Sequence, residues 1–201
     1  EFLRYYSMKI SIPTSLKEIP LSKFVEYQKS TKTDNEAVSI LCDIENITLL
    51  KLKDIQDISA ILNDVLNSDC EFVRRFTYKG VDYGFIPNLE NLSAAEHIIL
   101  EQTMASPDTW HLAMSVLYRP ITKIKRNWFN KSEPFYDIQK FKEPNNAFID
   151  APSVYYLGAC VFFFNLMKEL ESYMITYSMN ILKSSKIMKA DLIKSGDGML
   201  A

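Results

Sequence analysis

The residues with the most versatile chemistry in the chain are its two histidines, His97 and His111, which have Glu96, Glu101 and Asp108 near them in the sequence. A metal site needs three or four ligands that converge on one point. Neither His-x-x-x-His nor Cys-x-x-Cys occurs to place two such ligands on one face of an element. We therefore expect no bound metal, and structural or surface roles for both histidines.

Nucleophilic catalysis also lacks its usual sequence patterns. No serine stands in Gly-x-Ser-x-Gly, and no glycine-rich loop ends in Gly-Lys followed by Ser or Thr. The cysteines Cys42, Cys70 and Cys160 have unrelated spacings, and the apolar neighbours of Cys160 disfavour a thiolate. We expect reduced core thiols, no cofactor and no enzymatic activity.

Charge is distributed unevenly along the chain, although its formal net charge is only -2 over 201 residues. Residues 43–71 hold seven acidic and two basic side chains, a net charge of -5, whereas residues 121–142 hold six basic and two acidic side chains, a net charge of +4. The small overall charge excludes a protein that binds nucleic acid with its whole surface.

The basic stretch is the candidate binding site, because its cations alternate with apolar and aromatic side chains. The candidate residues are Lys123, Lys125, Arg126, Trp128, Phe129 and Lys131. This composition suits stacking on a single-stranded nucleic acid and neutralising its phosphates. Two other interpretations stay open. The aromatic residues anchor a surface loop to the body, or the basic loop meets an acidic face of another copy or of a partner protein, where complementary charge sets register and encounter rate.

Mainly helical elements must position these residues. Hydrophobic periodicity predicts helices over about residues 21–30, 36–42, 50–66, 94–104 and 106–119, the last of which ends before Pro120. Alternating residues on both sides of Lys79-Gly80 predict a single β-hairpin over residues 72–86.

The longest predicted helix runs from about Pro152 to Ile187. Its first half, residues 154–164, is apolar on every face and predicts burial all round, whereas its second half is apolar on one side only. Asn165 interrupts the apolar run after about a dozen residues, and a membrane span needs roughly 20. We therefore expect a core helix and no membrane association.

The predicted fold class is mainly α: a single helical domain organised on one long C-terminal helix, with one β-hairpin insertion. A chain of 201 residues that is 47% hydrophobic can bury one sizeable core. We expect an N-terminal arm over residues 1–14, a helical domain over 15–187 and a flexible tail over 188–201. The domain holds the hairpin at 72–86 and an extended surface excursion at 121–151.

Four short motifs follow one another along the chain: Ile12-Pro13-Thr14-Ser15, Tyr78-Lys79-Gly80 followed by Tyr83-Gly84-Phe85-Ile86-Pro87, Leu117-Tyr118-Arg119-Pro120-Ile121, and Val161-Phe162-Phe163-Phe164. Their order resembles that in small virion-module proteins of tailed phages, crAss-like phages of gut Bacteroidetes in particular. The resemblance implies a structural or tail-assembly protein that is located in the virion, or in the host cytoplasm during assembly. Its motifs carry no catalytic residue.

Together these observations favour a non-enzymatic phage virion structural or assembly protein that acts by protein–protein binding. Its expected partners are phage structural proteins and further copies of the chain in a ring or another multi-copy assembly. The alternative is a nucleic-acid-associated protein that is packaged in the virion and uses residues 123–131.

Overall fold

The computed structural model describes residues 10–87, 89–124 and 136–196. Their helices and strands follow in chain order. The described helices are α1 (Leu21–Lys29), α2 (Asp34–Leu41), α3 (Leu52–Leu66), α4 (Ala94–Met104), α5 (Trp110–Leu117) and α6 (Ser153–Gly196). The described strands are β1 (Arg75–Tyr78), β2 (Val81–Phe85), β3 (Tyr118–Ile124) and β4 (Tyr136–Ile138), which form one antiparallel sheet in the order β1-β2-β3-β4. The protein is therefore mainly helical, as predicted, but it contains a four-stranded sheet where the sequence predicted one hairpin.

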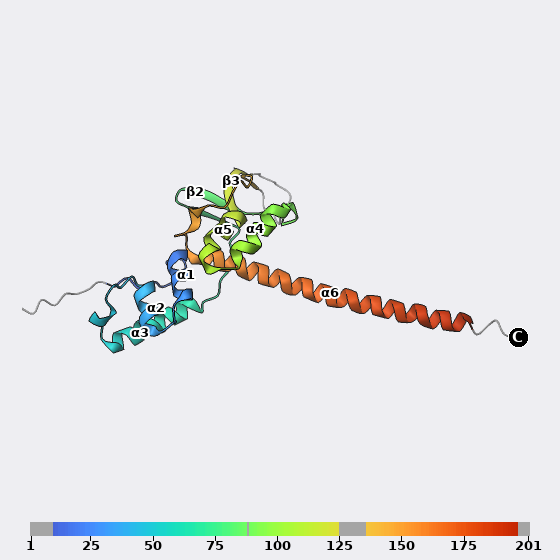
Figure 1. Ribbon diagram of the computed structural model, residues 1–201, viewed down its shortest axis with the longest axis horizontal. Helices are drawn as coiled ribbons and strands as arrows, with labels where there is room; N and C mark the ends of the chain where they lie inside the picture. The colour runs from blue at the N-terminus through green and yellow to red at the C-terminus, as the bar shows by residue number, and fades with distance from the viewer. Residues whose placement is uncertain (1–9, 88, 125–135, 197–201) are drawn as a thin grey trace, which may run out of the picture. The chain divides into compact units, whose positions relative to one another are not determined.

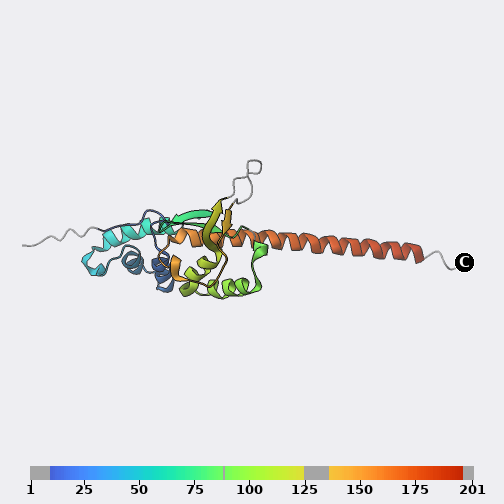
Figure 2. The same cartoon turned by 90° about the horizontal axis from the view of Figure 1, so that it is seen from above.

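Contacts divide the chain into two compact units, Glu1–Ala159 and Cys160–Ala201, where the sequence predicted one domain. The first unit holds α1 to α5, the sheet and the start of α6. Within it, α4 and α5 pack against each other, and both lie on the same side of the sheet (Figures 1 and 2).

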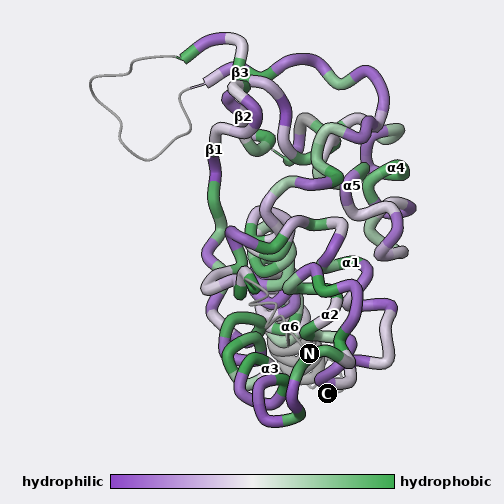
Figure 3. Tube along the Cα trace, turned by 90° about the vertical axis from the view of Figure 1, so that its left-hand side faces the viewer, coloured by the Kyte–Doolittle hydropathy of each residue, from purple (hydrophilic) through white to green (hydrophobic). Residues whose placement is uncertain are grey.

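Helices α1, α2 and α3 build one part of the core of the first unit, and Figure 3 shows hydrophobic and hydrophilic residues alternating along their traces. In α3 the side chains of Ile55, Ile58, Leu62 and Val65 are buried at helical spacing. The three acidic residues of α3 are exposed, so part of the acidic stretch 43–71 lies on the outside of an amphipathic helix.

The predicted hairpin forms from β1 and β2, with Phe76 opposite Tyr83. Lys79 and Gly80 connect the two strands with φ values of 47° and 77°. A two-residue turn with positive φ at both positions matches the twist of paired strands, and glycine adopts such a φ without steric cost. Phe76 then stacks on Tyr155 at the start of α6, with ring centroids 3.8 Å apart.

The segment 121–151, expected to be an extended surface excursion, instead contributes β4, much of β3 and two buried aromatic side chains. Tyr136 is 4% exposed and Phe148 is 1% exposed. The expectation failed because it rested on the polar composition of the segment and on the prolines within it, which do not reveal that β3 pairs with β2 and β4. Pro120 lies inside β3 opposite Tyr83. A bulge follows it between Ile121 and Lys123, and its carbonyl accepts a hydrogen bond from the amide of Gln139.

Helix α6 begins where two distant segments are tied together. The amide of Ser153 donates to the carbonyl of Ile19, and the amide of Leu21 donates to the carbonyl of Ala151. Ser153 is fully buried, and its hydroxyl donates to the carbonyl of Leu16. The first turn of α6 therefore belongs firmly to the first unit.

The prediction that α6 is buried on all sides over residues 154–164 was wrong in its second part. Tyr156 and Ala159 are buried, but Val161 is 39% exposed and Phe164 is 60% exposed. An all-apolar run shows that a helix gains from burial, and it does not show which partner covers the helix. The backbone of α6 is helical to Gly196, so residues 188–196, which were predicted to belong to a flexible tail, are part of the helix.

Candidate functional site

Only the first of the predicted binding residues lies in the described part of the chain. Lys123 is exposed near the end of β3 and lies opposite Asp137 of β4. Ile124, which follows, is 59% exposed. The remaining candidates lie outside the described residues: Lys125, Arg126, Trp128, Phe129 and Lys131. Because β3 and β4 are adjacent antiparallel strands, this basic-aromatic segment connects their ends.

Tyr136 fixes the strand that receives the connecting segment. Its hydroxyl donates to the carbonyl of Phe85 at 2.7 Å and lies 3.3 Å from the carbonyl of Arg74, so its ring crosses over β2. Gly84 makes this possible, since a Cβ atom there would lie 2.3 Å from Cε2 of the Tyr136 ring. The close approach of ring and backbone holds Tyr136, the first residue of β4, against β2.

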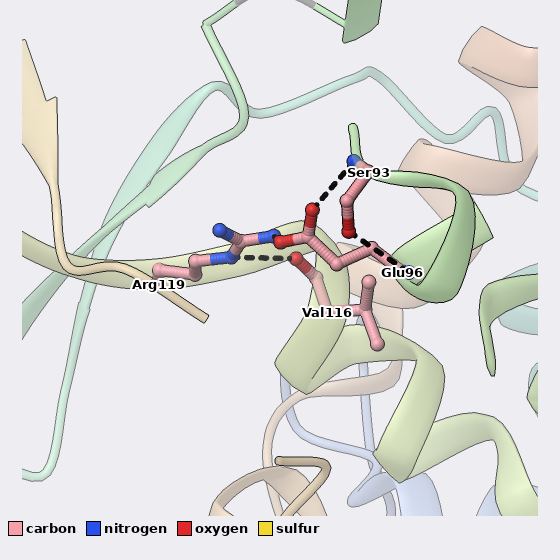
Figure 4. A network of polar contacts seen from close by, with 4 residues as sticks. All are labelled: Ser93, Glu96, Val116 and Arg119. Carbon is pink, nitrogen blue, oxygen red and sulfur yellow. Dashed lines mark hydrogen bonds and ion pairs between the residues drawn. The ribbon is translucent and has the colours of Figure 1, made fainter. Parts of the chain in front are cut away.

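Glu96 and Arg119 form a nearly buried ion pair, drawn in Figure 4. A terminal nitrogen of Arg119 lies 2.5 Å from Oε1 of Glu96, and the two side chains are 11% and 12% exposed. Arg119 Nε also donates to the carbonyl of Val116 at the end of α5. Arg119 therefore joins the C-terminus of α5 to the N-terminus of α4.

Ser93 completes the network with the capping box that its spacing from Glu96 predicts. Its backbone amide donates to Oε2 of Glu96 at 2.7 Å, and the Glu96 amide donates to the Ser93 hydroxyl. Both carboxylate oxygens of Glu96 thus accept hydrogen bonds. Burial by itself raises the pKa of Glu96, but the hydrogen bonds from Ser93 and the charge of Arg119 outweigh it and lower that pKa. A carboxylate held ionised by two donors stabilises the fold and is poorly suited to accept a proton from a substrate.

The sequence indicated only half of this network. The Ser-x-x-Glu spacing predicts the cap at Ser93 and Glu96, but for Arg119 it indicates only a favourable interaction with the C-terminal dipole of its own helix. No local pattern links Arg119 to a carboxylate 23 residues earlier.

A cavity of about 250 Å³ lies beside Arg119, between β3 and the chain that follows β4. Its polar lining includes Lys140, Lys142 and Glu143, and Arg119 itself is already paired with Glu96. Among the described residues that line this cavity, no nucleophile is paired with a general base. The cavity therefore has no recognisable reaction centre.

Neither histidine is placed for chemistry with its sequence neighbours. His97 is exposed on α4, and a ring nitrogen of His111 lies 3.0 Å from the amide oxygen of Asn146. Within the described residues, no three His, Cys, Asp or Glu side chains gather closely enough to hold a metal ion. Burial raises the pKa of Cys42 and of Cys70, which favours the neutral thiol at both positions.

Exposed apolar side chains are concentrated on α6 within the second unit. Between residues 161 and 181 the exposed large apolar residues are Val161, Phe164, Met167, Tyr173, Met174, Ile175, Tyr177, Met179 and Ile181. Single exposed apolar residues are normal on protein surfaces, whereas a contiguous set on one element marks a binding surface. None of the helices described here combines the length and apolar composition that crossing a bilayer demands.

Comparison of the chain with protein-family models, with curated proteins and with solved structures gave no match.

Proposed function

We propose that this protein is a non-enzymatic structural or assembly component of a tailed-phage virion and that it acts by binding other proteins. The observation that carries the proposal is the exposed apolar surface of α6 between Val161 and Ile181. Removing such a surface from water stabilises a complex by roughly 25 cal/mol for each Å² of apolar area. A partner helix is the simplest way to cover it.

The order of motifs that resembles small phage virion proteins supports the particular setting. Several of these motifs have structural tasks in this chain. Gly80 forms the hairpin turn, Gly84 admits the Tyr136 ring, and Arg119 joins α4 to α5. Motifs that preserve a scaffold fit a component of an assembly better than they fit an enzyme.

A second surface supports binding to protein as well. The exposed end of the β3–β4 pair, marked by Lys123 and Ile124, leads into the basic-aromatic segment. The acidic outer face of α3 offers complementary charge, so copies of the chain or phage proteins with acidic faces are suitable partners. The cations of residues 123–131 also support the second candidate function, a packaged nucleic-acid-associated protein.

The test is to measure the protein in purified virions and in assembly intermediates from infected cells. We expect a fixed copy number relative to the major head protein, and cross-links from α6 or from the β3–β4 end to phage structural proteins. Absence from both virions and intermediates, with no cross-link to any phage protein, would refute the proposal.

A further inference from the structure

One row of apolar residues on α6 repeats with the period of a coiled coil. Cys160, Phe163, Met167, Leu170, Met174, Tyr177 and Ile181 follow one another at alternating intervals of three and four residues. This spacing averages 3.5 residues, less than the 3.6 of a straight helix, so the row stays on one side only if the helix supercoils around another helix. We call these seven residues the heptad row.

The heptad row is exposed over most of its length. Met167 is 65% exposed, Met174 70%, Tyr177 67% and Ile181 51%, while Phe163 is half-buried. No polar residue interrupts the row from Cys160 to Ile181, which covers about 32 Å of helix at 1.5 Å per residue. Three uninterrupted heptads reach the length at which such a pattern indicates a coiled coil.

The other apolar residues of this helix do not form a comparable row. Val161 and Phe164 lie on another face, as do Ile175 and Met179, but exposed Lys168 stands between the two pairs. Its ammonium group lies 4.4 Å from the centre of the Phe164 ring. The charged group of Lys168 keeps the middle of that face compatible with water. The heptad row has no charged residue in its middle.

We propose that the heptad row binds the heptad row of a second copy of this chain, so that the protein self-associates through α6. The inference deepens the proposed function and rests on it, because it names the partner of the same surface. In a parallel pair each apolar residue meets its own equivalent, and the flanking positions meet one another across the seam. Over these three heptads the flanking positions are Phe164, Leu166, Glu171, Tyr173, Ser178 and Asn180.

These flanking positions explain why the partner is another copy. Glu171 is the one charged residue among them, and a parallel pair places it opposite Leu166, so no like charges meet. A helix that selects a foreign partner commonly does so with several charged flanking residues, which this helix lacks. Leu166 and Tyr173 widen the apolar face on one side, so trimers satisfy the same pattern as dimers.

The test compares two double variants of the full chain that have identical composition. Met174→Glu with Ile181→Glu places two charges in the heptad row, whereas Ile175→Glu with Met179→Glu places them on the opposite side of the same helix. All four residues are between 51% and 70% exposed. The helix therefore carries the same changes in residue type and net charge in both variants.

Light scattering after size exclusion, over the micromolar range, should give a multiple of the chain mass for the wild type and for the control variant. The heptad-row variant should have the mass of one chain and keep the cooperative thermal transition of the first unit. A monomeric wild type, or equal dissociation of both variants, would overturn the inference, as would an oligomer that neither variant dissociates.

A cross-linking experiment covers the case in which the heptad-row variant fails to fold. In a background in which the two partly exposed cysteines, Cys70 and Cys160, are replaced by alanine, oxidation of Met174→Cys should give a covalent dimer, and oxidation of Ile175→Cys under the same conditions should not; equal yields would count against self-association through the row. The virion measurement tests the proposed function independently of self-association. A monomeric chain that still cross-links to phage proteins would sink only the self-association, whereas a self-associating chain that binds no phage protein would sink only the proposed function.

Discussion

At the scale of single residues, the pair formed by Glu96 and Arg119 makes the sharpest stability prediction. Glu96→Ala leaves the guanidinium of Arg119 nearly buried without its carboxylate and removes one of the two hydrogen bonds of the capping box at the start of α4. Breaking a buried pair from one side costs about 3–5 kcal/mol. We expect a loss of this size in the free energy of unfolding, measured by urea denaturation.

The matched control is an exposed ion pair in the same unit. Lys29 and Asp108 are 2.7 Å apart, but their side chains are 53% and 61% exposed. Asp108→Ala should therefore change the free energy of unfolding by no more than about 1 kcal/mol. Similar losses in the two variants would show that the Glu96 pair is as well solvated as the exposed one.

The pKa of Glu96 also makes stability depend on pH. Its pKa is lower in the folded protein than in the unfolded chain, where a glutamate titrates near about 4.3. The unfolded state therefore takes up the proton first as the pH falls, so the stabilisation is present above about pH 4.3 and is lost as the pH drops through the lower, folded value. The variant Glu96→Gln lacks this pH-dependent contribution to the free energy of unfolding.

Urea denaturation between neutral pH and acid measures that component. We expect the free energy of unfolding of the wild type to fall more steeply below about pH 4.3 than that of Glu96→Gln, because only the wild type carries the titrating carboxylate. Parallel curves for the two proteins would contradict an ionised, stabilised Glu96.

Residue patterns in the sequence foresaw local interactions and missed distant ones. The cap between Ser93 and Glu96 spans three positions, so its spacing alone predicts it. Arg119 reaches Glu96 only because α5 and β3 return to the N-terminus of α4, and no periodicity encodes that return. The candidate binding residues, Lys123 included, were chosen from composition, and their role in binding remains a prediction.

At the scale of elements, the approach of Tyr136 to β2 can be tested through Gly84. A Cβ atom at this position would lie 2.3 Å from the Tyr136 ring, which is held by the hydrogen bond to the Phe85 carbonyl. Gly84→Ala should therefore destabilise the first unit by about 1–3 kcal/mol, as overpacking does in other well-packed cores. Thermal or urea unfolding measures the loss.

A double-mutant cycle identifies the ring as the cause. In the background of Tyr136→Ala the ring is gone, and alanine is favoured over glycine in a strand by roughly 0.5–1 kcal/mol. Gly84→Ala should then become neutral or stabilising, and this change of sign is a coupling that independent sites do not show. If the cost of Gly84→Ala is the same in both backgrounds, the packing described for β4 and β2 is wrong.

Elements that depend on neighbouring residues were predictable, and the sheet beyond the hairpin was not. The helix at Ala94–Met104 and the turn at Lys79-Gly80 follow from caps, periodicity and glycine chemistry. Strand β3 contains Pro120, which argues against a central strand, and its pairing with β2 joins residues far apart in the sequence. The sequence encodes the apolar faces, while the partners of those faces depend on the tertiary fold.

At the scale of the whole molecule, charge layout favours protein over nucleic acid as the partner. Three of the seven acidic side chains of residues 43–71 are exposed on α3, whereas the basic stretch begins in β3. Proteins that bind single-stranded nucleic acid combine a basic groove with stacking aromatics along several nucleotides. Here the net charge is -2, and the cations of residues 123–131 number four.

The last prediction concerns these four cations. If all of them contact phosphates of a single strand, the logarithm of the binding constant falls with a slope of about -2.8 against the logarithm of salt concentration, which leaves weak binding at about 0.15 M salt.

We therefore expect replacement of Lys123, Lys125, Arg126 and Lys131 by alanine to reduce association with phage proteins or with other copies. DNA binding at that salt, measured by fluorescence anisotropy, should change little. The control replaces Lys17 and Lys32, which are exposed and lie outside the basic stretch, α3 and α6, and should affect neither kind of binding. Submicromolar binding of single-stranded DNA that only the first variant loses, while its protein contacts persist, would favour the packaged nucleic-acid-binding protein instead.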